Sequence, residues 1–383
     1  MTHFWQELRS GRWLTADWAR AHSWRTSTIG PSKTGSSRTN VDQDQLRRAD
    51  RLIWASIAAT ATVVFAASLI GPFQISWVSF IKAGLACSLL TAAGWFYRTV
   101  RKDPLPAAAL TSTVQIMTFA MAGAPLSYIA ASAALPLWDT TLVAWDRHLG
   151  FDWLALLAVM NAHPALHVIF AFAYSSFALQ TTVVAIALAV TGHSLRLRVF
   201  ILSFVFATLV TIAISTIMPA QGAWGHLHLS IQDYPAITPV TQSLHLPVFH
   251  GLRDGTLRRL VGDGAEGIIT FPSLHTALGV LFIFALWPVR NLRWIAALLN
   301  IVMIAATPID GGHYFSDVIA GAAIAVLCWM AVGRAFCAGR VRASQIQPIS
   351  APSIVPEIVQ VTAAGHGSRE LELRQSETRA GAI

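Results

Sequence analysis

Charged residues are scarce in this chain of 383 residues: Asp, Glu, Lys and Arg make up only 12% of it, whereas 54% is hydrophobic. A soluble domain usually carries about 25% charged residues. Half that share, together with several apolar runs of about 20 residues, excludes an ordinary soluble domain and indicates an integral membrane protein.

Cysteine is also rare, and the three that occur are Cys87, Cys328 and Cys337. The first two lie inside apolar runs and the third follows the last run. None has a metal-binding or redox spacing, so we interpret them as small apolar packing residues. The sequence shows neither a Gly-rich nucleotide-binding loop nor an internal repeat.

Eight apolar segments predict an all-α, polytopic membrane protein with about eight transmembrane helices. We expect residues 1–50 to form a cytoplasmic tail, 51–100 two accessory transmembrane helices, and 343–383 a disordered cytoplasmic tail. The predicted spans are 51–71, 77–97, 114–136, 165–190, 198–218, 273–288, 293–309 and 315–335.

The net charge of +8 is distributed unevenly between the two sides of these spans. By the positive-inside rule the richer side is cytoplasmic, which places both termini in the cytoplasm. We expect a bacterial inner membrane. The richer side holds Arg98, Arg101, Lys102, Arg196, Arg198, Arg290, Arg293, Arg334, Arg340 and Arg342, and the other side holds Arg147, Arg253, Arg258 and Arg259.

Two segments with candidate chemistry begin spans on the non-cytoplasmic side. In the first, Pro272 and Ser273 open the sixth span, whose free N–H groups and helix dipole favour an anion, and His275 lies in the first turn. In the second, His313 and Asp317 are four residues apart, which predicts one helix face, and a carboxylate beside an imidazole fixes its tautomer. Gly311 and Gly312 would let the backbone approach a ligand.

Together these residues resemble the type 2 phosphatidic acid phosphatase (PAP2) superfamily. Its second motif, Pro-Ser-x-His, is present at 272–275, and the His-x3-Asp of its third motif is present at 313–317. The arginine of the third motif and the Lys-x6-Arg-Pro of the first are missing, which looks like the branch of inositol phosphorylceramide synthases. The resemblance implies a catalytic core at 114–336 with six helices.

By this resemblance the protein is a membrane lipid-phosphate phosphatase or phosphotransferase. We expect no cofactor, and no metal requirement because no carboxylate cluster or His/Cys ligand set accompanies the site. His313 attacks phosphorus, Asp317 orients it, and His275 protonates the leaving oxygen and later activates the acceptor. Water as acceptor gives hydrolysis, and a hydroxyl gives headgroup transfer. Candidate phosphate-binding residues are Ser273, Gly312 and one of Arg253, Arg258 and Arg259. The alternative interpretation of these arginines is a solvated loop that faces lipid headgroups.

Other polar residues receive simpler interpretations. His226, His228, His245 and His250 fit no strong metal-ligand pattern and are interpreted as polar loop residues. His163 and His167 are interpreted as interfacial residues. Asp139 and Asp146 share a helix face and either contact a headgroup or lie on a capped, solvent-facing helix.

Two other classes of function remain open at this stage. A transporter or flippase fits eight helices, but the sequence lacks an intramembrane charge chain and paired broken helices. A catalytically inactive scaffold is favoured by the missing basic residues. We expect a membrane lipid as partner and substrate, and no nucleic acid.

Overall fold

The structure is a computed structural model that describes residues 34–71, 73–262 and 267–345. Most of the two predicted tails, 1–50 and 343–383, falls outside these ranges. Within the first of them, however, helix α3 already begins at Thr34.

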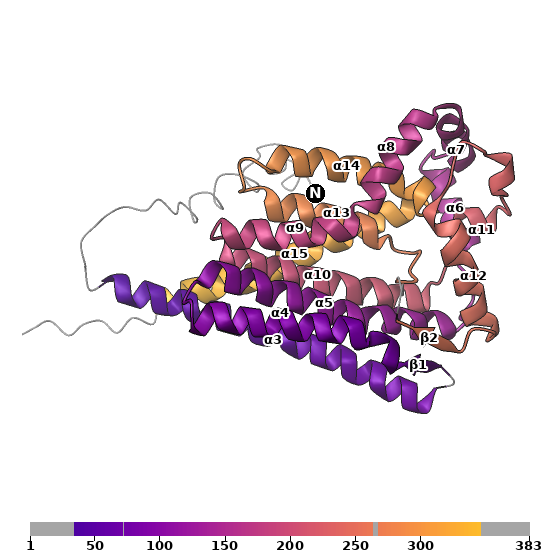
Figure 1. Cartoon of the computed structure of the whole chain (residues 1–383). Helices are drawn as coiled ribbons and strands as arrows, with labels where there is room; N and C mark the ends of the chain where they lie inside the picture. Colours follow the sequence, from indigo (N-terminus) through magenta and orange to yellow (C-terminus); the bar gives the residue numbers. More distant parts are fainter. Residues whose placement is uncertain (1–33, 72, 263–266, 346–383) are drawn as a thin grey trace, which may run out of the picture.

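A bundle of long helices runs through the molecule (Figure 1). Six helices of the described chain are long and apolar enough to cross a membrane, and a bend of 110° joins two further helices that would together make a seventh. The long helices are α3 (Thr34–Ile70), α4 (Ile81–Thr99, preceded by the 3-10 turn Trp77–Phe80), α5 (Pro104–Ser132), α10 (Ser194–Ile217), α14 (Arg293–Asp310) and α15 (Phe315–Gln345), and the bent pair is α7 (Trp153–Ala162) and α8 (Pro164–Ser175).

The two remaining predicted spans correspond to shorter apolar helices. The predicted span 165–190 divides at Ser176 into α8 and α9 (Phe177–Val190), and the predicted span 273–288 contains α13 (Leu274–Leu286). The helical membrane fold is thus confirmed, whereas the number of eight crossings stays a prediction.

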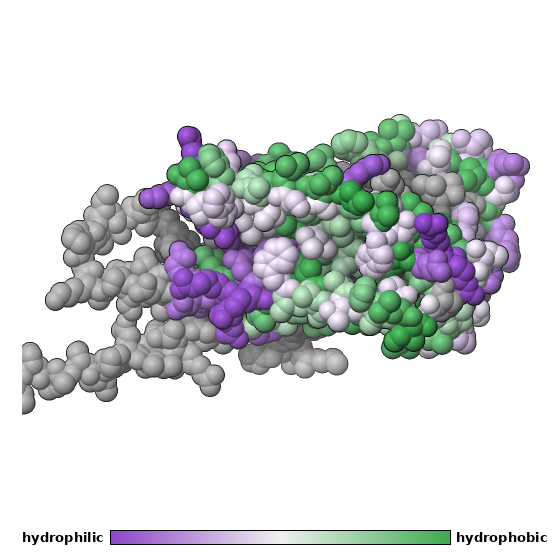
Figure 2. All heavy atoms as spheres, turned by 60° about the horizontal axis from the view of Figure 1, so that its bottom comes forward, coloured by the Kyte–Doolittle hydropathy of each residue, from purple (hydrophilic) through white to green (hydrophobic). Residues whose placement is uncertain are grey.

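The hydrophobic core follows α10 and α13. Phe200 and Ile201 of α10 are fully buried, as are Leu278, Leu281 and Phe282 of α13. The outside of the bundle is apolar as well, with side chains such as Leu69, Leu89 and Phe172 at least 70% exposed. Figure 2 shows this apolar surface along much of the bundle, with hydrophilic groups gathered toward its ends. Such a surface suits contact with lipid acyl chains.

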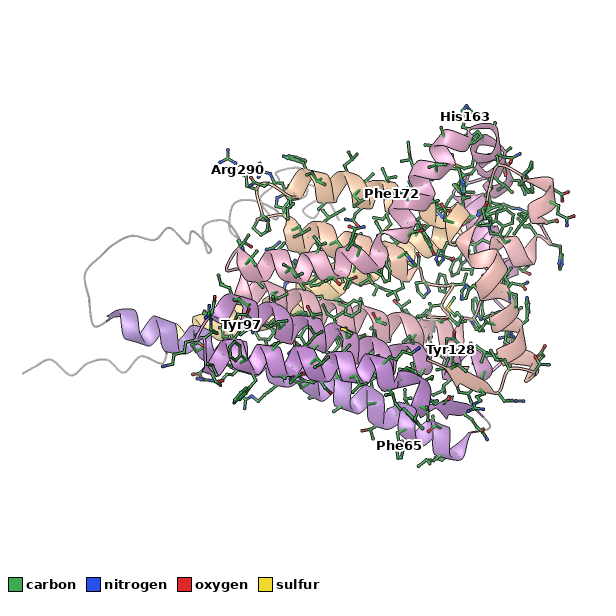
Figure 3. The ribbon with its side chains drawn as sticks, viewed as in Figure 1. Phe65, Tyr97, Tyr128, His163, Phe172 and Arg290 are labelled. Carbon is green, nitrogen blue, oxygen red and sulfur yellow. The ribbon has the colours of Figure 1, made fainter. Side chains whose placement is uncertain are left out.

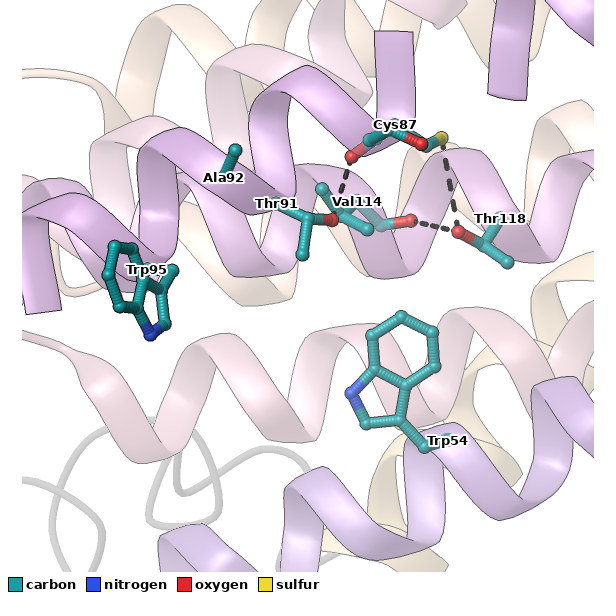
Figure 4. Close-up of a pocket in the computed structure, with 8 residues that line it drawn as sticks. Trp54, Cys87, Thr91, Ala92, Trp95, Val114 and Thr118 are labelled. Atoms are coloured by element: carbon teal, nitrogen blue, oxygen red, sulfur yellow. Dashed lines mark hydrogen bonds between the residues drawn. The ribbon is translucent and has the colours of Figure 1, made fainter. Parts of the chain in front are cut away.

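The first two helices differ in how they join the bundle. Helix α3 is tied to the core because Asp50 accepts hydrogen bonds from Arg198 Nε (3.2 Å) and Gln115 Nε2 (3.3 Å). Helix α4 packs against α5 and is largely exposed. Between α3, α4 and α5 lies an open groove of about 610 Å³, lined by residues that include Trp54, Cys87, Trp95 and Thr118 (Figure 4).

One end of the bundle carries a cap of short elements (Figure 1). Figure 3 places His163 and Tyr128 toward this end, and Tyr97 and Arg290 toward the other. Residues 219–272, between the fifth and sixth predicted spans, include a 15-residue helix and a short strand that pairs in parallel with another. These two short strands are a small addition to a fold that is otherwise helical, as predicted. The cap comprises α6 (Asp139–His148), α7, α11 (Ala223–His226), the 3-10 turn Ile231–Asp233, α12 (Val240–Asp254), β1 (Gln74–Ser76) and β2 (Arg259–Val261).

Candidate functional site

The start of α13 is fixed by a serine cap. Ser273 precedes the helix, is fully buried, and its Oγ accepts a hydrogen bond from the Thr276 backbone N–H (3.3 Å). Its own N–H is donated to the backbone carbonyl of Asp317 (3.1 Å). The Ser273 N–H, which the sequence offered as a phosphate donor, is therefore used within the protein.

The start of α15 holds the histidine–aspartate pair. Helix α15 begins at Phe315, so His313 lies just before the helix. The prediction from the spacing, that His313 and Asp317 share one helix face, is therefore wrong. The two side chains nevertheless meet: His313 Nδ1 is 3.2 Å from Asp317 Oδ2, and the same oxygen accepts the Tyr314 N–H (2.9 Å). Both side chains are buried. The Asp317 carboxylate thus orients the ring from the first turn of the helix.

A close backbone approach brings the two helix starts together. A Cβ added to Gly321 of α15 would lie 2.2 Å from the Ser273 carbonyl oxygen, so only glycine allows this contact. The Ser273–Asp317 backbone hydrogen bond lies at the same junction. The Pro-Ser-x-His and His-x3-Asp segments, which are some forty residues apart in the chain, therefore form one site.

His275 is held by aromatic rings. Its ring stacks on Tyr174 of α8 (centroids 4.1 Å apart, 14° between planes) and contacts Phe177 of α9 (4.6 Å). His313 and His245 are both close enough to interact with it electrostatically. Stacking fixes the plane of the imidazole while its nitrogens stay available at the ring edge.

Two buried aspartates build the wall of the site from α6. Asp146 accepts hydrogen bonds from the backbone N–H groups of Phe315 (2.7 Å) and Ser316 (2.8 Å), and so caps α15. Asp139 accepts from the N–H of Gly222 (3.0 Å) and from the Tyr314 hydroxyl (2.7 Å). One of the two sequence interpretations placed these aspartates on a solvent-facing helix surface. That interpretation is wrong, because both side chains are buried against the backbone.

Burial and the neighbouring Asp139 carboxylate raise the pKa of the Tyr314 phenol. The phenol therefore stays protonated and donates to the carboxylate. Burial lowers the pKa of the His313 imidazole to about 4, although an interaction with the Thr270 backbone works in the opposite direction. His313 is thus a neutral imidazole at neutral pH, which is the form in which a ring nitrogen can act as a nucleophile.

Indole groups secure the segment between α14 and α15. Trp153 Nε1 lies 3.2 Å from the carbonyl oxygens of both Pro308 and His313, and Trp224 Nε1 donates to the Ile309 carbonyl (2.9 Å). Gly312, with φ of +64°, turns its carbonyl to the Ala223 N–H (2.8 Å). The expected close approach at Gly312 is therefore one to the protein's own backbone.

The three loop arginines occupy different places. Arg253 of α12 donates to the Leu135 carbonyl (2.8 Å) and lies over the Phe249 ring. Arg258 is exposed and folds over Gly255. Arg259 is in β2, with its guanidinium 3.4 Å from Ser76 Oγ. Among the described residues, none of these arginines forms a hydrogen bond with His275 or His313.

His167 and His245 interact with other polar side chains in a way that the sequence did not predict. His167, interpreted as interfacial, is buried and its Nε2 lies 3.2 Å from Asp310 Oδ1 at the end of α14. His245, interpreted as a polar loop residue, interacts electrostatically with His313 and His275. No sequence spacing signals either contact, because both depend on how α8 and α12 dock onto the core.

An apolar groove of about 460 Å³ borders the site between α6 and α15. Ser316, next to Asp317, lines its wall, and its buried Oγ has no hydrogen-bond partner in the described chain. The groove is lined by Trp145, His148, Leu149, Phe271, Ser316, Ile319 and Ala320. Within the described ranges, no three His, Cys, Asp or Glu side chains are placed to hold a metal ion.

Fold and site together define a helical membrane protein with a buried His–His–Asp cluster at one end of its bundle. Comparison with known families gives a match to the PAP2 superfamily over residues 140–331, half of the chain. The chain belongs to the PAP2 superfamily, whose name indicates a phosphatase-type enzyme. No curated protein and no solved structure matches the chain significantly.

Proposed function

We propose that the protein is a lipid-phosphate phosphatase or phosphotransferase that works through a phosphohistidine at His313. The observation that carries this proposal is the convergence of His275, His313 and Asp317 at the adjoining starts of α13 and α15, beside an apolar groove. A polar reaction centre next to an apolar groove suits a substrate with a phosphate head and an acyl tail.

In the proposed mechanism, Asp317 holds His313 Nδ1, and Nε2 attacks phosphorus. The bond from phosphorus to the leaving oxygen breaks, and His275 supplies the proton that this oxygen takes up. His275 then removes a proton from the acceptor, which attacks the phosphohistidine and restores free His313. Water as the acceptor releases phosphate, and a lipid or polyol hydroxyl produces a new phosphodiester or phosphomonoester.

The proposal places the reaction on the non-cytoplasmic side of a bacterial inner membrane, with both termini in the cytoplasm. Helix α13 supports this placement because the site lies at its start, whereas Arg196 Nε donates to the Ala285 carbonyl (2.9 Å) at its far end. Arg290 lies toward that same far end in Figure 3. Basic residues are enriched on the cytoplasmic side of membrane proteins.

The test is turnover by the purified full-length protein in detergent, with a panel of lipid phosphates and phospholipids. Each is supplied with and without hydroxyl acceptors such as inositol and a ceramide. Free phosphate indicates hydrolysis, and a new phospholipid without free phosphate indicates headgroup transfer, as in the inositol phosphorylceramide synthase branch. Failure of every substrate to react would contradict the proposal.

Filling the apolar groove should impair long-chain substrates selectively. Ala320→Trp is expected to raise KM for a long-chain lipid phosphate about tenfold, because about 1.4 kcal/mol of chain burial is lost, while a short-chain analogue is affected little. Ala323→Trp, on an exposed position of the same helix, is the matched control. An equal effect on both chain lengths would show that the groove does not hold the chain.

Turnover should not depend on a metal ion. The proposed chemistry uses imidazole and carboxylate groups only, so extensive treatment with a chelator is expected to leave the rate unchanged. The measurement is the initial rate before and after treatment, with and without added Mg²⁺, Mn²⁺ or Zn²⁺. A loss of activity that only a metal restores would contradict this prediction.

A further inference from the structure

Helix α12, which carries His245, packs against α11 and α5. Leu246 packs so closely on α11 that a Cβ added to Gly225 would lie 2.9 Å from its Cδ2. Farther along α12, Phe249 and Leu252 are buried in a hydrophobic cluster with Tyr128 of α5. The position of His245 is therefore set by the packing of α12 against both α11 and α5.

His245 has a polar atom that no protein group satisfies. Its Nε2 is buried and has no hydrogen-bond partner among the described residues. Buried polar atoms in proteins are normally paired, and an unpaired one calls for an explanation such as a ligand or an ion. The His245 imidazole is near enough to His313 and His275 to interact with both electrostatically, so the side chain that carries this unpaired atom belongs to the same site.

The arrangement of the three histidines fits an oxyanion better than a metal. They are near enough to sense one another's charge, yet no three potential ligands in the described chain are close enough to share a metal ion. Burial, and secondarily the nearby His313 imidazole, lowers the pKa of His245 to about 4, so His245 is a neutral imidazole at neutral pH and can donate one N–H.

We propose that His245 binds the transferred phosphoryl group, donating a hydrogen bond from Nε2 to a non-bridging oxygen while His313 attacks phosphorus. This inference rests on the proposed function. Among the three arginines, Arg258 is exposed and Arg259 reaches Ser76. Arg253 donates from Nη2 to the Leu135 carbonyl, and its buried Nη1 has no hydrogen-bond partner among the described residues, so Arg253 is the competing phosphate donor that the experiment must separate from His245. The His245 donor stabilises the charge that develops on the oxygens in the transition state.

Orthovanadate, which imitates the five-coordinate phosphorus, tests this role by calorimetric titration of the full-length protein in detergent. His245→Leu keeps a side chain of roughly similar volume and removes the donor, so vanadate should bind about 10- to 100-fold more weakly. His245→Gln places an amide N–H near the position of Nε2 and should recover most of the affinity. His250→Leu, an exposed position on the same helix, is the matched control and should bind like the wild type.

A role in packing alone predicts the opposite order, with His245→Leu tolerated better than His245→Gln. Wild-type affinity in His245→Leu, or equal losses in the Leu and Gln variants, would overturn the proposal. Loss in Arg253→Gln but not in His245→Leu would assign the phosphate to Arg253 instead. Lipid-phosphate turnover in the same preparations separates failure of this inference from failure of the proposed function. An active wild type whose His245 variants bind vanadate normally would overturn this inference alone. A wild type with neither turnover nor vanadate binding would overturn the proposed function.

Discussion

His313→Ala is expected to abolish turnover, with a loss of at least about 10³-fold, because the variant has no nitrogen that can form the phosphohistidine. The fold should survive. The Tyr314 N–H still donates to Asp317, and Trp153 still reaches the backbone carbonyl of residue 313, since neither contact uses the imidazole. Initial rates and the Tm of the wild type and the variant, measured in the same detergent, check both parts of the prediction.

His250→Ala serves as the control for loss of a histidine from the same end of the molecule, and it should keep the wild-type rate and Tm. Activity within a few fold of the wild type in His313→Ala would contradict the nucleophilic role. An inactive variant with a strongly lowered Tm would show instead that the ring holds the structure together.

Asp146→Ala is expected to destabilise the protein by about 2–5 kcal/mol, because two buried N–H groups lose a charged acceptor. These are the N–H groups of Phe315 and Ser316, which open α15 and precede Asp317. Displacement of that turn should also lower kcat, although Asp146 touches no reacting group in the proposed mechanism. Thermal unfolding in detergent and steady-state kinetics measure the two effects.

Asp152→Ala is the matched control, since Asp152 caps α7 from an exposed position and accepts a hydrogen bond from the Ala155 N–H (3.1 Å). Its Tm should change far less than that of Asp146→Ala. Equal Tm values for Asp146→Ala and the wild type would show that the cap from α6 contributes nothing to stability. Direct contact with the substrate headgroup, the other sequence interpretation of Asp139 and Asp146, would then be the better explanation of these residues.

The membrane helices were predictable because their signal is local. Apolar runs such as 198–218 and 293–309 are longer than a buried helix of a soluble core usually requires. Helices α10 and α14 begin and end close to these bounds. The short cap helices were not. Helix α12 lies in a stretch with Pro247 and three polar residues at its start, and its apolar positions become meaningful only where they meet Tyr128 and α11.

The site was predictable only as far as motifs reached. Pro-Ser-x-His and His-x3-Asp drew attention to His275, His313 and Asp317, and the structure brings these three together. His245 and the contacts of Asp139 and Asp146 were missed, since each depends on partners that are distant in the chain. Packing of the cap onto the bundle, which no spacing encodes, determines those contacts.

The most direct test of the central claim is to trap the phosphorylated enzyme. The purified protein is mixed with a lipid phosphate carrying labelled phosphorus, quenched in alkali, which preserves phosphohistidine, and analysed by peptide mass spectrometry. We expect label on His313 in the wild type, more label in a His275→Ala variant that cannot activate the acceptor, and none in His313→Ala. Label on another residue, or turnover by a wild type that never carries label at His313, would contradict the central claim.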